Sequence, residues 1–236
     1  MFGVSTFCLH TVPLPAALNR LCEITDYIEI MDDGPHHVES ADLLRNYSAR
    51  YSFHAPSRGV NIASLLEPIR RASVEVLGHC FEVAAEVNAP VIIHPGYFAW
   101  PAERSRAEQQ LRTSLAELNR LKAEYGIEFF VENMGNWDYF FLKTPVELSL
   151  IDGSGLALDV GHANQNQCLS EFLAEPARHY HLHDNKGTED THSEIGTGTI
   201  DFSNVMCAVQ KSGITPIIEV STFDAVRNSI LRLESE

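Results

Sequence analysis

The feature that most constrains the fold is a series of short apolar runs, each of which ends on a histidine or a carboxylate. A short apolar run with turn signals on either side is typical of a buried β-strand. When such runs repeatedly end on residues that can bind metal, they predict parallel strands that deliver ligands to one end of a barrel or sheet. The runs are YSFHAP to His54, PVIIHPG to His94, IEFFVEN to Glu132, LALDVGH to Asp159, HYHLHD to His181 and TPIIEV to Glu219.

Helical segments alternate with these runs along the whole chain, and two further strands are expected over residues 2–8 and 26–31. Eight strands with helices between them predict a (β/α)8 TIM barrel in the α/β class. No linker or change of composition divides the sequence, so one domain is expected over residues 1–236. The expected helices cover residues 13–22, 41–46, 67–87, 101–126, 144–150, 171–175, 202–212 and 224–233.

The bulk composition narrows the choice of partners and compartment. A formal net charge of −15 argues against broad, nonspecific binding to nucleic acid or to anionic membranes. No apolar stretch approaches the length of a membrane span, so no membrane partner is expected. The five cysteines are scattered without a CxxC pair, which favours a reducing compartment and a cytoplasmic location. The oligomeric state is not readable from the sequence.

Four of the strand-end residues form the strongest candidate for a metal site. Glu132, Asp159, His181 and Glu219 come from four consecutive predicted strands. Clustered carboxylates repel one another and lose solvation when buried, so their gathering at one end of a barrel needs a compensating cation. Three carboxylates and an imidazole suit a divalent ion such as zinc, manganese or cobalt.

The remaining strand-end and loop residues could hold further ions. His54 and His94 could bind a second ion, with Glu132 as a bridge, while His162 could bind a third together with Asp190 and His192. We therefore expect one to three divalent ions, with zinc first and manganese or cobalt as alternatives. Taken singly, each residue also has an ordinary structural explanation, such as a helix cap or a buried hydrogen bond.

At these residues the sequence resembles the xylose isomerase-like TIM-barrel superfamily (AP endonuclease family 2). The resemblance runs from HAP at His54 to IIEV at Glu219. That superfamily contains the endonuclease IV DNA repair enzymes and many sugar-phosphate isomerases and epimerases. Endonuclease IV enzymes bind three zinc ions through nine residues, and the resemblance gives each a counterpart here. These counterparts are His54, His94, Glu132, Asp159, His162, His181, Asp190, His192 and Glu219.

The resemblance leaves two chemistries open. The favoured prediction is a divalent-metal-dependent isomerase or epimerase of a sugar or sugar phosphate, which works by proton transfer through an enediolate. Glu132 and Glu219 would then be the catalytic base and acid. The alternative is an endonuclease IV-like zinc phosphodiesterase that acts on abasic-site DNA. The SRGVNIAS loop after His54 lacks the bulky residues that the endonucleases place there, which favours the first; the presence of all nine ligands favours the second.

Five residues are candidate substrate contacts. Glu29 could contact a sugar hydroxyl or pair with a basic residue of the barrel. His183 is the most plausible alternative ligand, or a substrate contact, because strand alternation places it on the same face as His181. Lys186 and Arg58 are the nearest cations for a substrate phosphate. Trp137 could stack on a sugar face or simply pack at the barrel rim.

Overall fold

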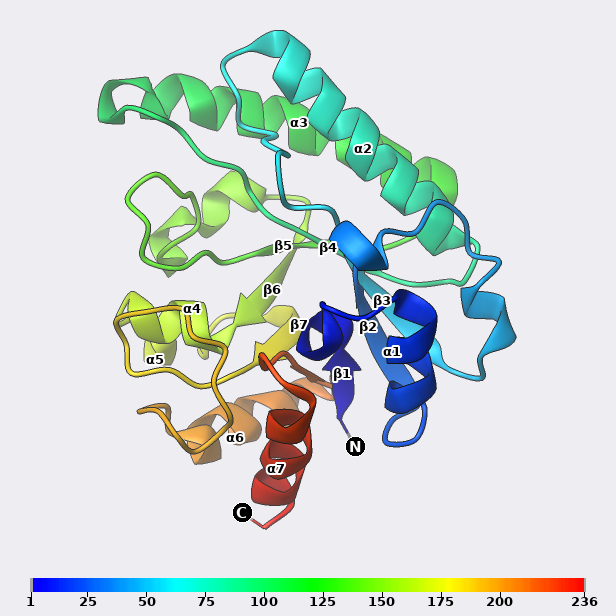
Figure 1. Cartoon of the computed structure of the whole chain (residues 1–236). Coiled ribbons are helices and arrows are strands. Elements are labelled where there is room, and N and C mark those ends of the chain that lie inside the picture. The colour runs from blue at the N-terminus through cyan, green and yellow to red at the C-terminus, as the bar shows by residue number, and fades with distance from the viewer. Residues whose placement is uncertain (1, 236) are drawn as a thin grey trace.

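Eight parallel strands form one closed barrel in the computed structural model, which describes residues 2–235 (Figure 1). Consecutive strands are neighbours around the barrel, and the last strand pairs with the first. This arrangement confirms the predicted (β/α)8 fold. The strands are β1 (Gly3–Ser5), β2 (Tyr27–Met31), β3 (Arg50–His54), β4 (Val91–Ile93), β5 (Phe129–Glu132), β6 (Gly155–Asp159), β7 (Ala177–Leu182) and β8 (Ile217–Ile218).

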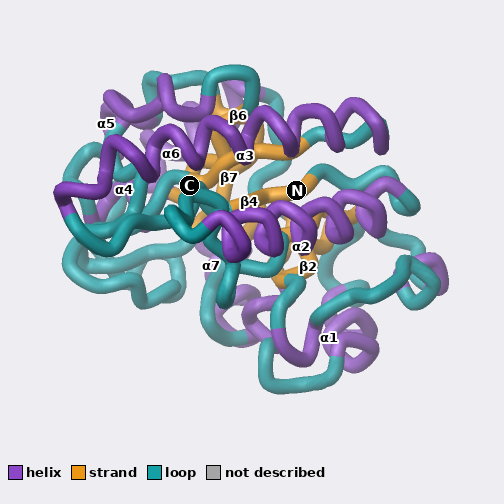
Figure 2. The backbone as a smooth tube through the Cα atoms, turned by 90° about the horizontal axis from the view of Figure 1, so that it is seen from above, coloured by secondary structure: helices purple, strands orange, loops and turns teal. Residues whose placement is uncertain are grey.

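Helices surround the barrel, as the view from above shows (Figure 2). None of the helices in the described part of the chain is long and apolar enough to cross a membrane. The α-helices are α1 (Leu14–Leu21), α2 (Glu67–Ala85), α3 (Arg104–Tyr125), α4 (Val160–Gln165), α5 (Leu169–Phe172), α6 (Phe202–Ser212) and α7 (Phe223–Glu234). The 3-10 helices are η1 (Thr6–Leu9), η2 (Gly34–His36), η3 (Leu44–Asn46), η4 (Pro101–Glu103) and η5 (Pro145–Ile151).

The two longest helices, α2 and α3, pack side by side over one flank of the barrel (Figure 1). Leu111, Leu115 and Leu118 lie on one stripe of α3 and are buried against the core. Burial of each such leucine stabilises the fold by roughly 1.5–3 kcal/mol. The helix ends at Gly126, whose φ of 70° is a left-handed conformation that glycine adopts without strain.

Several predicted boundaries were wrong. The helix expected over 41–46 is only the 3-10 turn η3. The helix over 144–150 is the 3-10 helix η5. The first strand ends at Ser5, whose side chain accepts a hydrogen bond from the Phe7 amide and starts η1. The short helix α4, directly after Asp159, was not predicted.

Candidate metal centre

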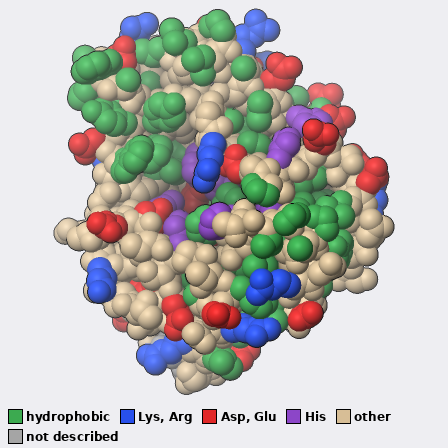
Figure 3. Space-filling view, in the orientation of Figure 1, with side chains coloured by type: hydrophobic (Ala, Val, Ile, Leu, Met, Phe, Trp, Pro, Cys, Tyr) green, Lys and Arg blue, Asp and Glu red, His purple; other side chains and the backbone are tan. Residues whose placement is uncertain are grey.

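The predicted ligands meet at the carboxyl ends of the barrel strands, around a cavity of about 640 Å³. Figure 3 shows histidine and acidic side chains gathered in a hollow on this face of the molecule. His54, His94, Glu132 and Glu219 all border the cavity. The ligands therefore occupy the end of the barrel where enzymes of this fold carry out their chemistry.

The first cluster, which we call the core group, contains Glu132, Asp159, His181 and Glu219. Its four ligand atoms lie within 4.8 Å of one another. Nδ1 of His181 is 2.9 Å from Oε1 of Glu132, 3.5 Å from Oε2 of Glu219 and 3.9 Å from Oδ2 of Asp159. All four side chains are almost fully buried. Three buried carboxylates around one imidazole carry more negative charge than a single histidine can balance, which favours a bound cation.

The second cluster, the bridge group, shares Glu132 with the core group. Nε2 of His54 and Nε2 of His94 are 3.1 Å apart, and they lie 3.3 and 3.1 Å from Oε2 of Glu132. Nδ1 of His54 donates a hydrogen bond to the carbonyl of Ala55, so its Nε2 can present a lone pair. Although burial lowers the pKa of His54, its contacts with Glu132 raise that pKa to about 9.

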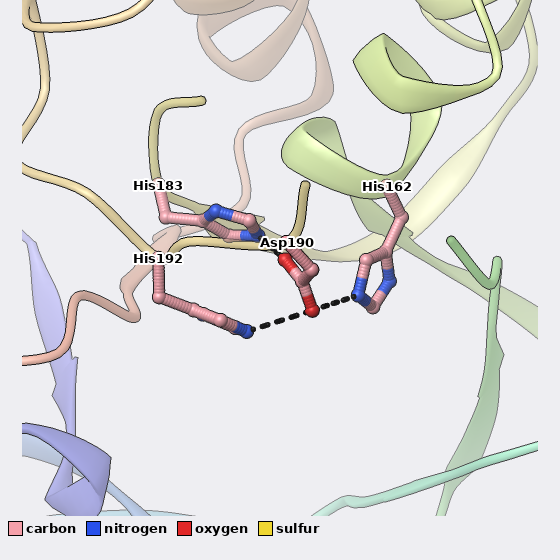
Figure 4. Close-up of side chains that lie close together, drawn as sticks. All are labelled: His162, His183, Asp190 and His192. Atoms are coloured by element: carbon pink, nitrogen blue, oxygen red, sulfur yellow. Dashed lines mark hydrogen bonds and ion pairs between the residues drawn. The ribbon is translucent and has the colours of Figure 1, made fainter. Parts of the chain in front are cut away.

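The third cluster contains His162, His183, Asp190 and His192 (Figure 4). We call the three predicted members, His162, Asp190 and His192, the rim group. Oδ2 of Asp190 is 3.1 Å from Nε2 of His162 and 3.2 Å from Nε2 of His192. Nδ1 of each histidine donates to a backbone carbonyl, that of Asn133 for His162 and that of Glu219 for His192. Carbonyl oxygens only accept, so both Nε2 atoms are left facing the carboxylate with lone pairs. Such an arrangement requires either added protons or a metal ion.

His183 lies beside the rim group and stacks on His192, with ring centroids 4.0 Å apart (Figure 4). Its Nε2 is 3.0 and 3.1 Å from the two carboxylate oxygens of Asp159. Its Nδ1 has no hydrogen-bond partner within residues 2–235. The proton therefore belongs on Nε2, where it is donated to Asp159. This geometry makes His183 a support for a core-group carboxylate, and its ring also lies close enough to His162, Asp190 and His192 to complete a four-residue ligand set with them.

The loop that carries the rim group is held by an acid from the end of the preceding strand. The Asp184 carboxylate accepts hydrogen bonds from the amides of Gly196 and Gly198. A Cβ at Gly198 would lie 2.2 Å from Oδ1 of Asp184, so this close approach requires glycine. Within the loop, His192 has a φ of 42°, a strained conformation for a residue with a side chain.

Of the five predicted substrate contacts, two border the cavity and three do not. Arg58 and Trp137 border the cavity, and Trp137 stacks on Phe140 with ring centroids 5.5 Å apart. Glu29 and His183 are fully buried, and neither is among the described residues that border the cavity. Lys186 is exposed but lies outside this lining as well.

Asn133 supports the site in a way that the sequence analysis missed. Its side chain accepts from the amide of Asp159 at 2.7 Å and donates to the carbonyl of Asp159 at 2.9 Å. Its own carbonyl accepts from His162. Its position directly after Glu132 in the VEN motif could have indicated this supporting role.

The donor set fits zinc or a similar divalent ion. The donors are imidazole nitrogens and carboxylate oxygens, which zinc, manganese and cobalt all accept. The N···O separations within the three groups run from 2.9 to 3.9 Å and bracket the roughly 3.3 Å between ligands of a tetrahedral zinc ion. The residues present could therefore hold a metal without large movements.

Comparisons with known proteins place the chain in a family. A family model described as "Xylose isomerase-like TIM barrel" matches residues 25–235. An uncharacterised protein of Methanocaldococcus jannaschii is 34% identical over 92% of this chain and 91% of its own. A probable endonuclease 4 of Mycobacterium leprae is 24% identical over 89% of this chain and 90% of its own.

Solved structures show the same fold. The crystal structure of a D-tagatose 3-epimerase-like protein has a TM-score of 0.91 and 28% identity, and it covers 99% of this chain and 96% of its own. The IolI protein, solved with a bound zinc atom, has a TM-score of 0.76 and 17% identity, with coverage of 99% and 96%.

Proposed function

The chain belongs to the xylose isomerase-like TIM-barrel family, and within it we propose that the protein is a divalent-metal-dependent epimerase or isomerase of a sugar or sugar phosphate. The observation that carries this proposal is the pair Glu132 and Glu219. Both carboxylates belong to the core group and both border the cavity. Similarity to the D-tagatose 3-epimerase-like protein supports the same class of reaction.

In this proposal one glutamate of the pair removes a proton from the carbon next to the substrate carbonyl, and the other returns a proton to the opposite face. A divalent ion in the core group would supply positive charge to stabilise the negative oxygen that develops. Burial alone would raise the pKa of Glu132. The charge of His181 and the contacts with His54 and His94 nevertheless hold that pKa well below its usual range, so the carboxylate is ionised in the metal-free protein.

The walls of the cavity suit a small polar substrate with one apolar face. Trp137, Phe140 and Phe7 border the cavity and offer flat surfaces on which a sugar ring or chain can lie. Arg58 is the one arginine or lysine among the described residues of the lining. A single cation fits one phosphate group of a sugar phosphate better than a DNA backbone, which needs several.

The test is exchange of substrate hydrogen with solvent. Metal-loaded protein in D2O would be incubated with ketoses such as D-tagatose, D-allulose and D-fructose, and with ketose phosphates, and deuterium at the carbon next to the carbonyl would be followed by NMR. We expect exchange and epimerisation that chelation abolishes. The proposal fails if fully loaded protein exchanges no hydrogen in any of these substrates.

A second candidate function rests on the rim group. Proton transfer needs only the core group, whereas His162, Asp190 and His192 offer a further site that the proposed reaction does not use. That surplus, together with the endonuclease 4 relative, favours a metal-dependent phosphodiesterase. Cleavage of abasic-site DNA by zinc-loaded protein, lost in a His162→Ala variant, would replace the epimerase proposal with this one.

A further inference from the structure

A second layer of charged residues lies beneath the core group, centred on Glu29 of β2. This carboxylate has no exposed surface. Its Oε1 is 2.8 Å from Nε2 of His181, and its Oε2 is 2.8 Å from Nε2 of His179. The hydroxyl of Ser52 donates to Oε2 at 2.9 Å. Glu29 is therefore enclosed by partners from two other strands of the barrel.

The contact between Glu29 and His181 lies on the opposite side of the imidazole ring from the metal ligands. Nε2 of His181 faces Glu29, while Nδ1 faces Glu132 at 2.9 Å. A neutral imidazole carries its proton on only one nitrogen, and the other nitrogen then has the lone pair that binds a metal. In this structure Nδ1 makes a hydrogen bond to Oε1 of Glu132. Once an ion takes the place of that proton, the negative charge of Glu29 favours the remaining proton on Nε2, which leaves the lone pair on Nδ1.

We propose that Glu29 is a positioning residue for the core group: it keeps the His181 proton on Nε2 and so directs the Nδ1 lone pair toward the bound ion. The proposal rests on the metal site of the proposed function. The contact is short but does not meet hydrogen-bond geometry, so it acts mainly through charge. A carboxylate behind a metal-binding histidine also raises the basicity of the ligand.

A purely structural role for Glu29 makes a different prediction. A buried acid between two histidines could simply balance their charge and stabilise the barrel. In that case its replacement would lower stability equally with and without metal. The intrinsic affinity for metal would then stay unchanged. Metal affinity therefore separates the two roles.

The experiment measures zinc affinity of the core group by competition with a chromophoric chelator. Glu29→Gln keeps the size of the side chain but removes its charge. We expect core-group affinity to fall by about 10–100-fold, or roughly 1.4–2.7 kcal/mol, while the ion in the rim group is unaffected. Ser52→Ala is the matched control, because it removes a contact to Glu29 but keeps the carboxylate against His181. Wild-type affinity in Glu29→Gln would overturn the proposal.

A second measurement uses the wild-type protein and does not depend on how the variant folds. In zinc-loaded protein labelled with 15N at histidine, the ring nitrogens of His181 report which one carries the proton. A proton on Nε2 with the metal on Nδ1 is the expected result, and the reverse would overturn the proposal. Neither readout requires turnover, so the proposal can stand even if the epimerase activity is not found.

Discussion

The substitution Gly161→Ala is expected to damage the core group without touching a ligand. Gly161 lies in α4, two residues after Asp159. A Cβ at this position would lie 2.0 Å from Cε1 and 2.4 Å from Nε2 of His183. Real Cβ atoms do not come so close to other atoms, so the imidazole must move. Its 3.0 Å hydrogen bond to Asp159 then breaks.

The change in the free energy of unfolding is the sum of two destabilising contributions and one stabilising contribution. Overpacking of a filled core costs about 1–3 kcal/mol. Loss of a hydrogen bond to a charged group costs about 1.5–3 kcal/mol. Alanine in place of glycine in a helix stabilises the helix by up to about 1 kcal/mol. The net destabilisation is therefore about 1.5–6 kcal/mol, and the freed Asp159 should also bind metal more weakly.

Urea unfolding and zinc competition would measure these two effects. Gly78→Ala is the matched control, since a Cβ there meets only the flexible end of Leu121 at 3.1 Å. The control should unfold within about 1 kcal/mol of wild type and bind zinc normally. If Gly161→Ala matched wild type in both assays, the role given to His183 in holding Asp159 would be refuted.

Three further predictions concern catalysis, pH and the substrate. Glu219→Gln should keep its fold and part of its metal but lose about 10²–10⁴-fold in the rate of hydrogen exchange with solvent; normal exchange would remove it from the acid–base pair. The pKa values of His54 and His192 are raised to about 9, above their unfolded value near 6.5. The stability they add to metal-free protein is therefore complete below about pH 6.5 and lost as pH rises through about 9, whereas zinc affinity rises over the same window. Both quantities can be followed by urea midpoints and zinc titrations over roughly pH 6 to 10. Stability and zinc affinity that change in the same direction with pH would contradict this prediction. Trp137→Ala should raise KM by about 2–10-fold with little change in kcat, in keeping with loss of a stacking contact, and an unchanged KM would place the substrate elsewhere.

Much of the candidate metal centre could be predicted from the sequence, because consecutive strands of a barrel are neighbours and their carboxyl ends lie at the same rim. Each apolar run ended on its ligand, and parallel strands bring their carboxyl ends to one rim. The rule of alternation also placed His183 on the same face as His181, and both reach buried carboxylates, His181 that of Glu29 and His183 that of Asp159.

The roles of the supporting residues could not be read in the same way. Glu29 was left open between a substrate contact and a partner for a basic residue, and His183 between a ligand and a substrate contact. In the structure Glu29 faces His181 from across the barrel, and His183 faces Asp159 on the neighbouring strand. Which side chain lies opposite depends on strand register and barrel closure, and these are not encoded in any local pattern. The small helix α4 was missed because its apolar pattern is too short to be periodic.

The metal centre is tested most directly by the metal content of purified protein after zinc loading, combined with an anomalous-scattering map of the barrel mouth. We expect an ion between Glu132, Asp159, His181 and Glu219, with further ions in the bridge and rim groups at saturating zinc. A loaded protein with no ion in the core group would contradict both the metal centre and the function proposed for it.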